Sequence, residues 1–324
     1  MSVTVAAVIT AQDRRKYLPD AIRSAVTAGA DEIIVVRNFS DPLDETVRGR
    51  CNDILVTDPE IGAKHVAGLA AARSDVVCFL DDDDLWEPGK VASVRDWFSD
   101  PALVYADHFQ TPVDAEDRPV VARHPEWARR AFRPGPVDLL NDFHRFHEEN
   151  WPGNCSSTCV RRSWTTEFAP WLQKAGWSAD TFWLVAAAVS RRPTRFPPDR
   201  LTRLRLHDAN MSQTRGSDPA QFRERHRVMC ERFARGFGVM IEMARTHGAA
   251  GTDLERFLVQ RERIFRYWAE LESGRLTRRS SFRFLWQGPR WDHSYAIATM
   301  LSTASPDLAR RMVYRSSVRR WSVA

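Results

Sequence analysis

The chain has 324 residues, of which 43% are apolar, and a formal net charge of +5. This composition excludes a chain too polar to form a hydrophobic core, and the length allows one large domain or two medium ones. No stretch approaches the roughly 20 apolar residues that span a bilayer, no signal-peptide pattern opens the chain, and the five cysteines form no C-x-x-C pair, so we expect a cytoplasmic protein with reduced thiols.

The first hundred residues alternate between two hydrophobic periods. Short apolar runs predict strands at 3–10, 32–37, 54–57, 76–80 and 103–106. Helical spacing predicts helices between them at 17–28, 41–50, 63–73 and 89–98, with Pro88 in the first turn of the last one. Strands that alternate with helices predict an α/β fold, in which a mostly parallel sheet carries helices on both faces.

The rest of the chain changes character twice. The stretch 107–215 is rich in Trp, Pro, His and Asn and is less regular, which suits a substrate-binding half. From residue 219 onward the chain has a helical pattern and holds twenty arginines against ten acidic residues. We expect a C-terminal helical appendage with helices at 222–244, 253–272 and 307–321.

Four consecutive aspartates, Asp81 to Asp84, directly follow the apolar run 76–80. Like charges this close raise one another's pKa, and a bound cation relieves the repulsion. Carboxylate oxygens are preferred ligands of Mg²⁺ and Mn²⁺, and open α/β sheets bind ligands at the carboxyl ends of their strands. The sequence therefore predicts a divalent metal site, with a solvated acidic turn as the alternative interpretation.

The segment FLDDDDLWEP, residues 79–88, resembles the aspartate motif of glycosyltransferase family 2, whose members have the GT-A fold. The motif of that family is usually Asp-x-Asp-Asp, followed by two or three apolar residues and proline. The resemblance implies that Asp83 ligates Mn²⁺ or Mg²⁺. It also implies that Asp81 or Asp82 contacts the nucleotide ribose or the water shell of the metal, with Asp81 as a second metal ligand.

A later segment, LTRLRLHDANMS at 201–212, resembles the strand that closes the family's catalytic domain. Arg205, His207, Asn210 and Ser212 match that pattern. The resemblance places His207 near the metal and the diphosphate, where a neutral imidazole can ligate Mn²⁺. A surface histidine in an arginine-rich loop is the alternative.

Asp180 opens an apolar, aromatic helix in WSADTFWLV, residues 177–185. Family 2 enzymes place their catalytic base at such a position, so the resemblance implies that Asp180 is the general base. A helix N-cap is the structural alternative, and a cap and a catalyst are compatible. Glu148 and Glu149 are the other candidates for the base.

The nucleotide side departs from the family pattern at three places. The first strand ends Thr10-Ala11-Gln12-Asp13, and Asn38 stands where an aspartate usually contacts the base. Lys64 and His65 occupy the place of the usual Ala-Arg-Asn. The resemblance implies nucleotide-sugar contacts for Thr10, Gln12, Asn38, Lys64 and His65, but the departures leave the nucleotide open.

The acceptor side is expected around 150–162, which resembles the family's acceptor-side strand. We expect Trp151, Asn154 and Trp183 to contact the acceptor, with Trp151 as a platform on which a sugar stacks. A core tryptophan is the equal alternative for Trp151.

Together these resemblances imply a metal-dependent glycosyltransferase that moves a sugar from a nucleotide-diphosphate sugar to an acceptor hydroxyl with inversion. Residues 1–106 are expected to bind the donor, residues 107–215 to bind the acceptor, and residues 216–324 to form the helical appendage. The alternatives are a retaining glycosyltransferase, a nucleotidyltransferase, and a non-catalytic scaffold with the same fold.

The C-terminal arginines allow two interpretations. The last predicted helix carries arginines beside Leu308, Met312 and Trp321, as basic helices at anionic interfaces do. A solvated or dimer-forming helix is the alternative. We therefore expect either peripheral membrane contact or a homodimer through the C-terminal helices, and no nucleic-acid partner, because no motif of the usual kinds is present.

Overall fold

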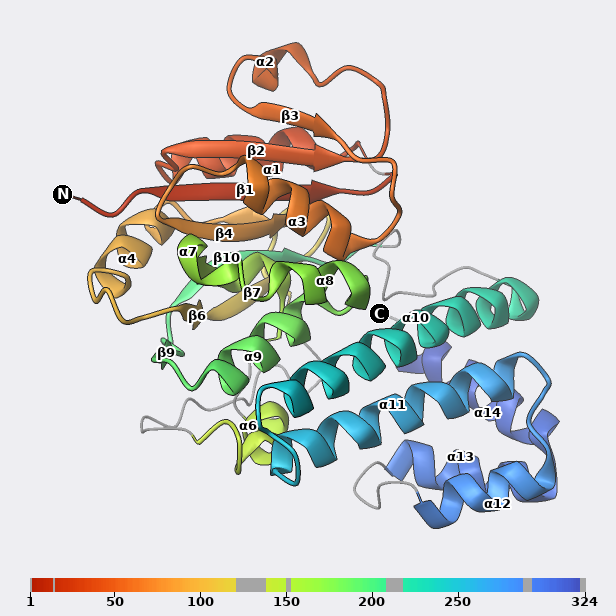
Figure 1. Ribbon diagram of the computed structural model, residues 1–324. Helices are drawn as coiled ribbons and strands as arrows, with labels where there is room; N and C mark the ends of the chain where they lie inside the picture. Colours follow the sequence, from red (N-terminus) through yellow and green to blue (C-terminus); the bar gives the residue numbers. More distant parts are fainter. Residues whose placement is uncertain are drawn as a thin grey trace. The chain divides into compact units, whose positions relative to one another are not determined.

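The computed structural model describes residues 2–13, 15–120, 138–149, 153–207, 218–287 and 293–320. The chain divides into two compact units (Figure 1). The first comprises Met1–Leu206 and Met243–Leu254, and the second comprises His207–Glu242 and Glu255–Ala324. The expected division at 106 and 215 concerns function and stays a prediction, because these units are defined by packing alone.

The first unit is built on a seven-stranded sheet with the order β3-β2-β1-β4-β8-β6-β9. Its strands are β1 (Val5–Ala11), β2 (Glu32–Arg37), β3 (Asn52–Leu55), β4 (Val76–Asp81), β6 (Tyr105–Asp107), β8 (Thr158–Arg161) and β9 (Thr194–Arg195). All pairs are parallel except those that β8 makes with β4 and β6. The predicted α/β fold with a mostly parallel sheet is confirmed.

Helices cover both faces of this sheet. The helices of this part of the chain are α1 (Leu18–Thr27), α2 (Glu45–Arg48), α3 (Ile61–Ala71), α4 (Lys90–Trp97), α6 (Phe143–Glu149), α7 (Arg162–Thr165), α8 (Ala169–Ala175) and α9 (Ala179–Ser190). Successive residues of β1 point to opposite faces of the sheet, so each face packs against different helices. Val5, Ala7 and Ile9 share a core cluster with buried residues of α1 and α4. Val8 points the other way, where a Cβ on Gly68 of α3 would lie 2.3 Å from its Cγ1 atom, so α3 packs closely only because residue 68 has no side chain.

A second sheet of three strands joins distant segments, in the order β5-β10-β7. Its strands are β5 (Leu85–Trp86), β7 (Phe109–Val113) and β10 (Arg200–Arg205). The helix predicted at 89–98 is α4, which begins at Lys90, so Pro88 precedes its first turn. The sequence did not predict β5, which forms by pairing with β10 at Leu85 and Trp86.

The second unit is helical. The end of α10 and the start of α11 fall within Met243–Leu254, which belongs to the first unit. The helices are α10 (Pro219–Thr246), α11 (Asp253–Glu272), α12 (Arg278–Gln287), α13 (His293–Ala304) and α14 (Pro306–Arg320). The predicted helical appendage is confirmed, but α12 and α13 were not predicted from the sequence. The core of the unit gathers Phe222 of α10, Tyr267 of α11 and Ala298 of α13. Among the described helices, none is both long and apolar enough to cross a membrane.

Candidate active site

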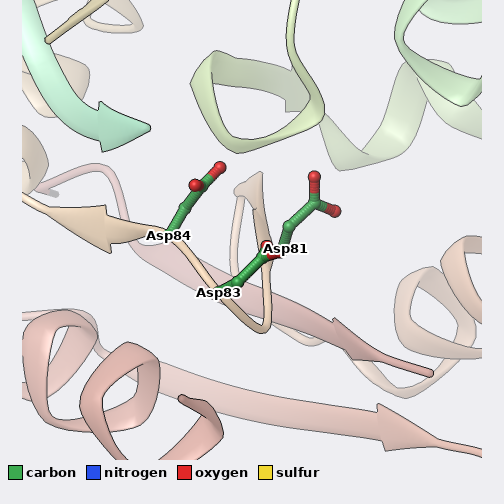
Figure 2. Close-up of side chains that lie close together, drawn as sticks. All are labelled: Asp81, Asp83 and Asp84. Atoms are coloured by element: carbon green, nitrogen blue, oxygen red, sulfur yellow. The ribbon is translucent and has the colours of Figure 1, made fainter. Parts of the chain in front are cut away.

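The four aspartates form a tight turn at the carboxyl end of β4. The N–H of Asp84 donates to the carbonyl of Asp81 at 3.2 Å, and Asp82, Asp83 and Asp84 are each at most 5% exposed. Figure 2 shows Asp81, Asp83 and Asp84 on this turn. Each of the three offers a ligand atom, and these atoms lie within 4.8 Å of one another.

Asp84 is fixed by two distant segments. The Ser156 hydroxyl donates to Oδ2 of Asp84 at 2.6 Å, and the backbone N–H of Arg205 donates to Oδ1 at 2.9 Å. The same Ser156 oxygen accepts the N–H of Asp81 at 3.0 Å. Burial, together with the charges of Asp83 and Asp81, raises the pKa of Asp84 well above its ordinary value, against the opposing effect of these hydrogen bonds.

The three carboxylates suit a hard divalent cation as ligands. Three carboxylates converge on one side of a largely buried turn, and oxygen ligands of this kind are what Mg²⁺ and Mn²⁺ bind. A cation there would offset the repulsion that raises the pKa of Asp84. The predicted metal ligands Asp81 and Asp83 thus lie together, and Asp84 joins them as a third.

The end of β1 lies against the aspartate turn. Thr10 pairs in register with Asp81, and its hydroxyl lies 3.4 Å from the Oδ1 atom of that residue. The N–H of Gln12 lies 3.4 Å from Oδ2 of Asp82. The Gln12 side chain in turn accepts a 3.0 Å hydrogen bond from Nζ of Lys64. The structure thus brings together four residues that were predicted to bind the donor: Thr10, Gln12, Lys64 and Asp82.

Lys64 supports this loop from inside. Its side chain is fully buried, and Nζ also donates to the carbonyl of Asp58 at 3.1 Å. Burial lowers the pKa of Lys64, while the nearby carboxylate of Asp58 acts in the opposite direction. Lys64 therefore holds the Gln12 side chain in the loop that follows β1.

Asn38 and Asp13 connect the loops that follow β1 and β2. The Asn38 amide donates to Oδ1 of Asp13 at 2.9 Å, and its oxygen accepts the N–H of Asp13 at 2.9 Å. Arg37 orders the loop after β2. It makes a bidentate ion pair with Asp53, with both hydrogen bonds at 2.7 Å, and it donates to the carbonyl of Asp41 at 2.6 Å. Asn38 lies in the loop after β2, as predicted, and its side chain is hydrogen-bonded to Asp13.

His65 and Trp183 belong to the hydrophobic core, and both are fully buried. His65 stacks on Phe79 with ring centroids 4.0 Å apart, and its Nδ1 lies 3.4 Å from the indole nitrogen of Trp183. Burial, with a smaller contribution from Lys64, lowers the pKa of His65 to about 3, so the ring is neutral. The prediction that Trp183 contacts the acceptor does not fit, because the indole presents no exposed surface, and the His65 ring likewise presents none.

Asp180 lies in the first turn of α9, and Ser178 is the residue that precedes the helix. The N-cap alternative for Asp180 is therefore wrong. Its Oδ1 accepts the N–H of Thr181 at 2.7 Å. Burial raises the pKa of Asp180, and the bonds to Thr181 oppose that shift.

The thiol of Cys155 relates Asp180 to the aspartate turn. Burial raises the pKa of this thiol well above its ordinary value, and the carboxylates of Asp81, Asp180 and Asp107 raise it further. A hydrogen bond to the backbone of Asp180 acts in the opposite direction. The backbone of Asp180 therefore contacts the residue that precedes Ser156, and Ser156 in turn donates to Asp84.

The remaining predicted residues are placed only in part. Asn154 precedes the short turn Cys155–Ser157, and its side chain accepts the N–H of Ser156 at 2.5 Å. His207 is buried and is the first residue of the second unit. Trp151, Asn210 and Ser212 lie outside the described residues, as do the side chains of Glu148 and Glu149.

Sequence reasoning missed the residues that hold this site in place. Lys90 is fully buried, and its Nζ donates to the carbonyl of Ser156 at 2.6 Å and to the hydroxyl of Thr202 at 3.2 Å. The Arg205 guanidinium donates to Oδ1 of Asp117 at 2.9 and 2.7 Å. Arg205 was noticed only as part of a motif, and a buried lysine or serine has no local signal that distinguishes it from a surface one.

Two comparisons with known sequences agree on the N-terminal half. The model of the family described as "Glycosyl transferase family 2" matches residues 6–158. An uncharacterized glycosyltransferase of Nostoc sp., alr2836, is 29% identical over 126 residues. That match covers 36% of this chain and 39% of the Nostoc protein, so the chain spans well under half the length of this relative.

Solved structures with a similar arrangement include TarS of S. aureus. The crystal structure of TarS 1–349 has a TM-score of 0.47 and 13% identity, and the match covers 97% of this chain and 88% of that one. The structure of TarS 1–349 in complex with UDP-GlcNAc has a TM-score of 0.46 and 11% identity, with 98% and 89% covered.

Proposed function

We propose that this chain, whose residues 6–158 match the model of glycosyltransferase family 2, transfers a sugar from a nucleotide-diphosphate sugar to an acceptor hydroxyl, with inversion at the anomeric carbon. The observation that carries the proposal is the convergence of Asp81, Asp83 and Asp84 at the carboxyl end of β4 inside that domain. Residues 1–106 form the donor half of the proposed site, and residues 107–215 form the acceptor half.

The donor half suits a phosphorylated ligand bound with a cation. Asp81, Asp83 and Asp84 are the proposed ligands of Mn²⁺ or Mg²⁺, and the resemblance adds His207 as a further proposed ligand. Such an ion supplies charge stabilisation for a leaving nucleoside diphosphate without any proton transfer. Thr10 and Gln12 contact this turn at Asp81 and Asp82, and we assign Thr10, Gln12 and Asp82 to the sugar or ribose.

The acceptor half must remove a proton from the attacking hydroxyl. Asp180 is the proposed base, because its pKa is raised by burial and its side chain is held by Thr181 at the start of a buried helix. A carboxylate with a raised pKa holds an abstracted proton better than an ordinary one, and general base catalysis typically contributes about 10²–10⁴ in rate. Asn154 and Trp151 remain the proposed acceptor contacts.

A thermal-shift screen tests the donor assignment. The chain is incubated with UDP-, GDP-, TDP- and CDP-sugars, each with and without Mn²⁺. A ligand of the folded protein raises the melting temperature by mass action, so we expect one nucleotide series to stabilise the chain only when Mn²⁺ is present. No shift with any donor would overturn the proposal in favour of a non-catalytic scaffold.

Product analysis tests the reaction itself with the donor found by the screen. Release of the nucleoside diphosphate, and NMR that shows the opposite anomer in the product, support the proposal. Retention of configuration indicates a retaining transferase, and release of pyrophosphate indicates a nucleotidyltransferase.

A further inference from the structure

Most of the exposed large apolar side chains among the described residues lie in the second unit. Among the described residues, six large apolar side chains are strongly exposed, and only Leu55 lies in the first unit. The other five lie on the last three helices: Phe282, Trp286, Ile297, Met300 and Leu308. Trp286 is 82% exposed and Phe282 is 62% exposed, whereas large aromatic side chains are usually well buried.

Helix α12 has one face that combines these aromatics with arginines. Ser281 and Phe284 are buried, so they mark the side that faces the core. Arg279, Phe282, Arg283 and Trp286 are all exposed, and their spacing of i, i+3, i+4 and i+7 places them on one side of a helix. We call these four residues the α12 outer face.

The surrounding sequence is strongly basic. Residues 274–324 contain ten arginines and two acidic residues, Asp292 and Asp307. A helix face that presents apolar rings between cations, in a segment of net positive charge, has the properties of helices that lie in the interface of an anionic bilayer. Tryptophan is favoured there because its ring is apolar and its N–H is polar.

We propose that the α12 outer face binds an anionic lipid surface, with Phe282 and Trp286 inserted among the lipids and Arg279 and Arg283 against the headgroups. This goes beyond sugar transfer and does not depend on it. The sequence predicted membrane contact or a homodimer through the C-terminal helices, from the arginines of the last one, whereas the exposed rings lie on α12, a helix that the sequence did not predict. Ile297 and Met300 on α13 supply further exposed apolar area.

Two other occupants fit less well. Single-stranded nucleic acid would use the arginines and the rings, because bases stack on aromatic side chains, but Ile297, Met300 and Leu308 have no such use. A second copy of this chain would bring Arg279 and Arg283 near the same residues of its partner, and like charges at an interface cost affinity.

Vesicle flotation of the full chain tests the proposal. Vesicles of phosphatidylcholine alone are compared with vesicles that contain about 30% phosphatidylglycerol, at low and high salt. We expect binding only to the anionic vesicles, and we expect it to weaken as salt rises. One variant is Phe282→Ala with Trp286→Ala, and the other is Arg279→Glu with Arg283→Glu. Each arginine near an anionic surface contributes roughly a fivefold change in affinity, so both variants should bind at least tenfold more weakly.

Matched controls separate the α12 outer face from general effects. Leu55→Ala removes an exposed apolar side chain of the first unit, and Arg73→Glu with Arg192→Glu reverses two exposed charges there. Both should float like the wild type, and circular dichroism should show unchanged helix content in every variant. Absence of binding to anionic vesicles, or equal loss in the controls, overturns the proposal. So does α12-dependent binding of a single-stranded oligonucleotide or α12-dependent dimerisation, measured by fluorescence anisotropy and by sedimentation, without vesicle binding.

Discussion

The hydroxyl of Ser156 donates a 2.6 Å hydrogen bond to Asp84, across 72 positions of the sequence. The same oxygen accepts the N–H of Asp81, so one buried serine holds both ends of the aspartate turn. The geometry of the proposed metal ligands therefore depends on a residue that is not itself a proposed ligand.

Ser156→Ala should weaken the response to metal. Residues that orient metal ligands typically change metal affinity about 10–100-fold when they are replaced, and the loss of a buried hydrogen bond to a carboxylate costs about 1–3 kcal/mol of stability. Titration of the melting temperature with Mn²⁺ measures both effects. Ser157→Ala is the matched control, because Ser157 donates to Asp107 instead. It should lose stability without losing the metal response, and equal metal responses in the two variants would contradict the role of Ser156.

Asp84→Asn should separate stability from metal binding. In the metal-free protein it removes one of several crowded, buried carboxylates, so the melting temperature should rise. The stabilisation by Mn²⁺ should fall at the same time, because one ligand charge is lost. Differential scanning calorimetry with and without Mn²⁺ measures both changes. A metal-free variant that is less stable than the wild type would show that repulsion does not dominate at this turn.

Asp180→Asn should lower the turnover number about 10²–10⁴-fold, because the amide cannot accept the proton of the acceptor. The shape and the bond from Thr181 are retained, so the donor-induced thermal shift should remain as in the wild type. Steady-state kinetics and the donor titration measure the two properties separately. Turnover at the wild-type rate would remove Asp180 from the mechanism.

The pH dependence of kcat/KM and of stability should both show the titration of Asp180. Burial raises the pKa of Asp180 above its ordinary value of 3.8, and a base must be ionised to act, so kcat/KM should fall on the acid side at a higher pH than for an exposed aspartate. The stability of the fold depends on pH in the opposite direction to activity, because the protonated form of Asp180 is the more stable one when folded. The folded state binds this proton more tightly than the unfolded chain, so the stability is fully present below the ordinary pKa and is partly lost as pH rises through the raised one. Asp180→Asn should thus be the more stable form at neutral pH, as urea unfolding at several pH values can measure.

Variants of Trp183 test whether this buried side chain contacts the acceptor. Trp183→Ala should cost about 3–5 kcal/mol, because it leaves a cavity beside His65 and Phe79. Trp183→Phe keeps most of the packing and should leave the KM for the acceptor unchanged. Denaturant unfolding and steady-state kinetics check the two variants. A selective rise in acceptor KM for Trp183→Phe would restore the original prediction.

Much of the first unit could be predicted from the sequence. The strands at 32–37 and 76–81 were found within a residue, because a buried parallel strand is a continuous apolar run. The aspartate turn was found because four adjacent carboxylates beside such a run are a local signal. The short strand β5 was missed, since two residues carry no periodicity and Leu85 and Trp86 became a strand only by pairing with β10. Helices α12 and α13 were missed because their apolar residues are divided between a buried and an exposed side.

By itself, the sequence determined the α/β architecture, the resemblance to the family and the position of the aspartates, because these follow from local patterns of polarity and charge. Only the tertiary structure decided which side chains support that turn and which lie out of reach. It brought Ser156 and the Arg205 backbone to Asp84, tied Asn38 to Asp13, and enclosed Trp183 and His65 in the core. The reason is physical: burial and hydrogen bonding between distant segments depend on how the chain folds back on itself, and no local pattern encodes that distance.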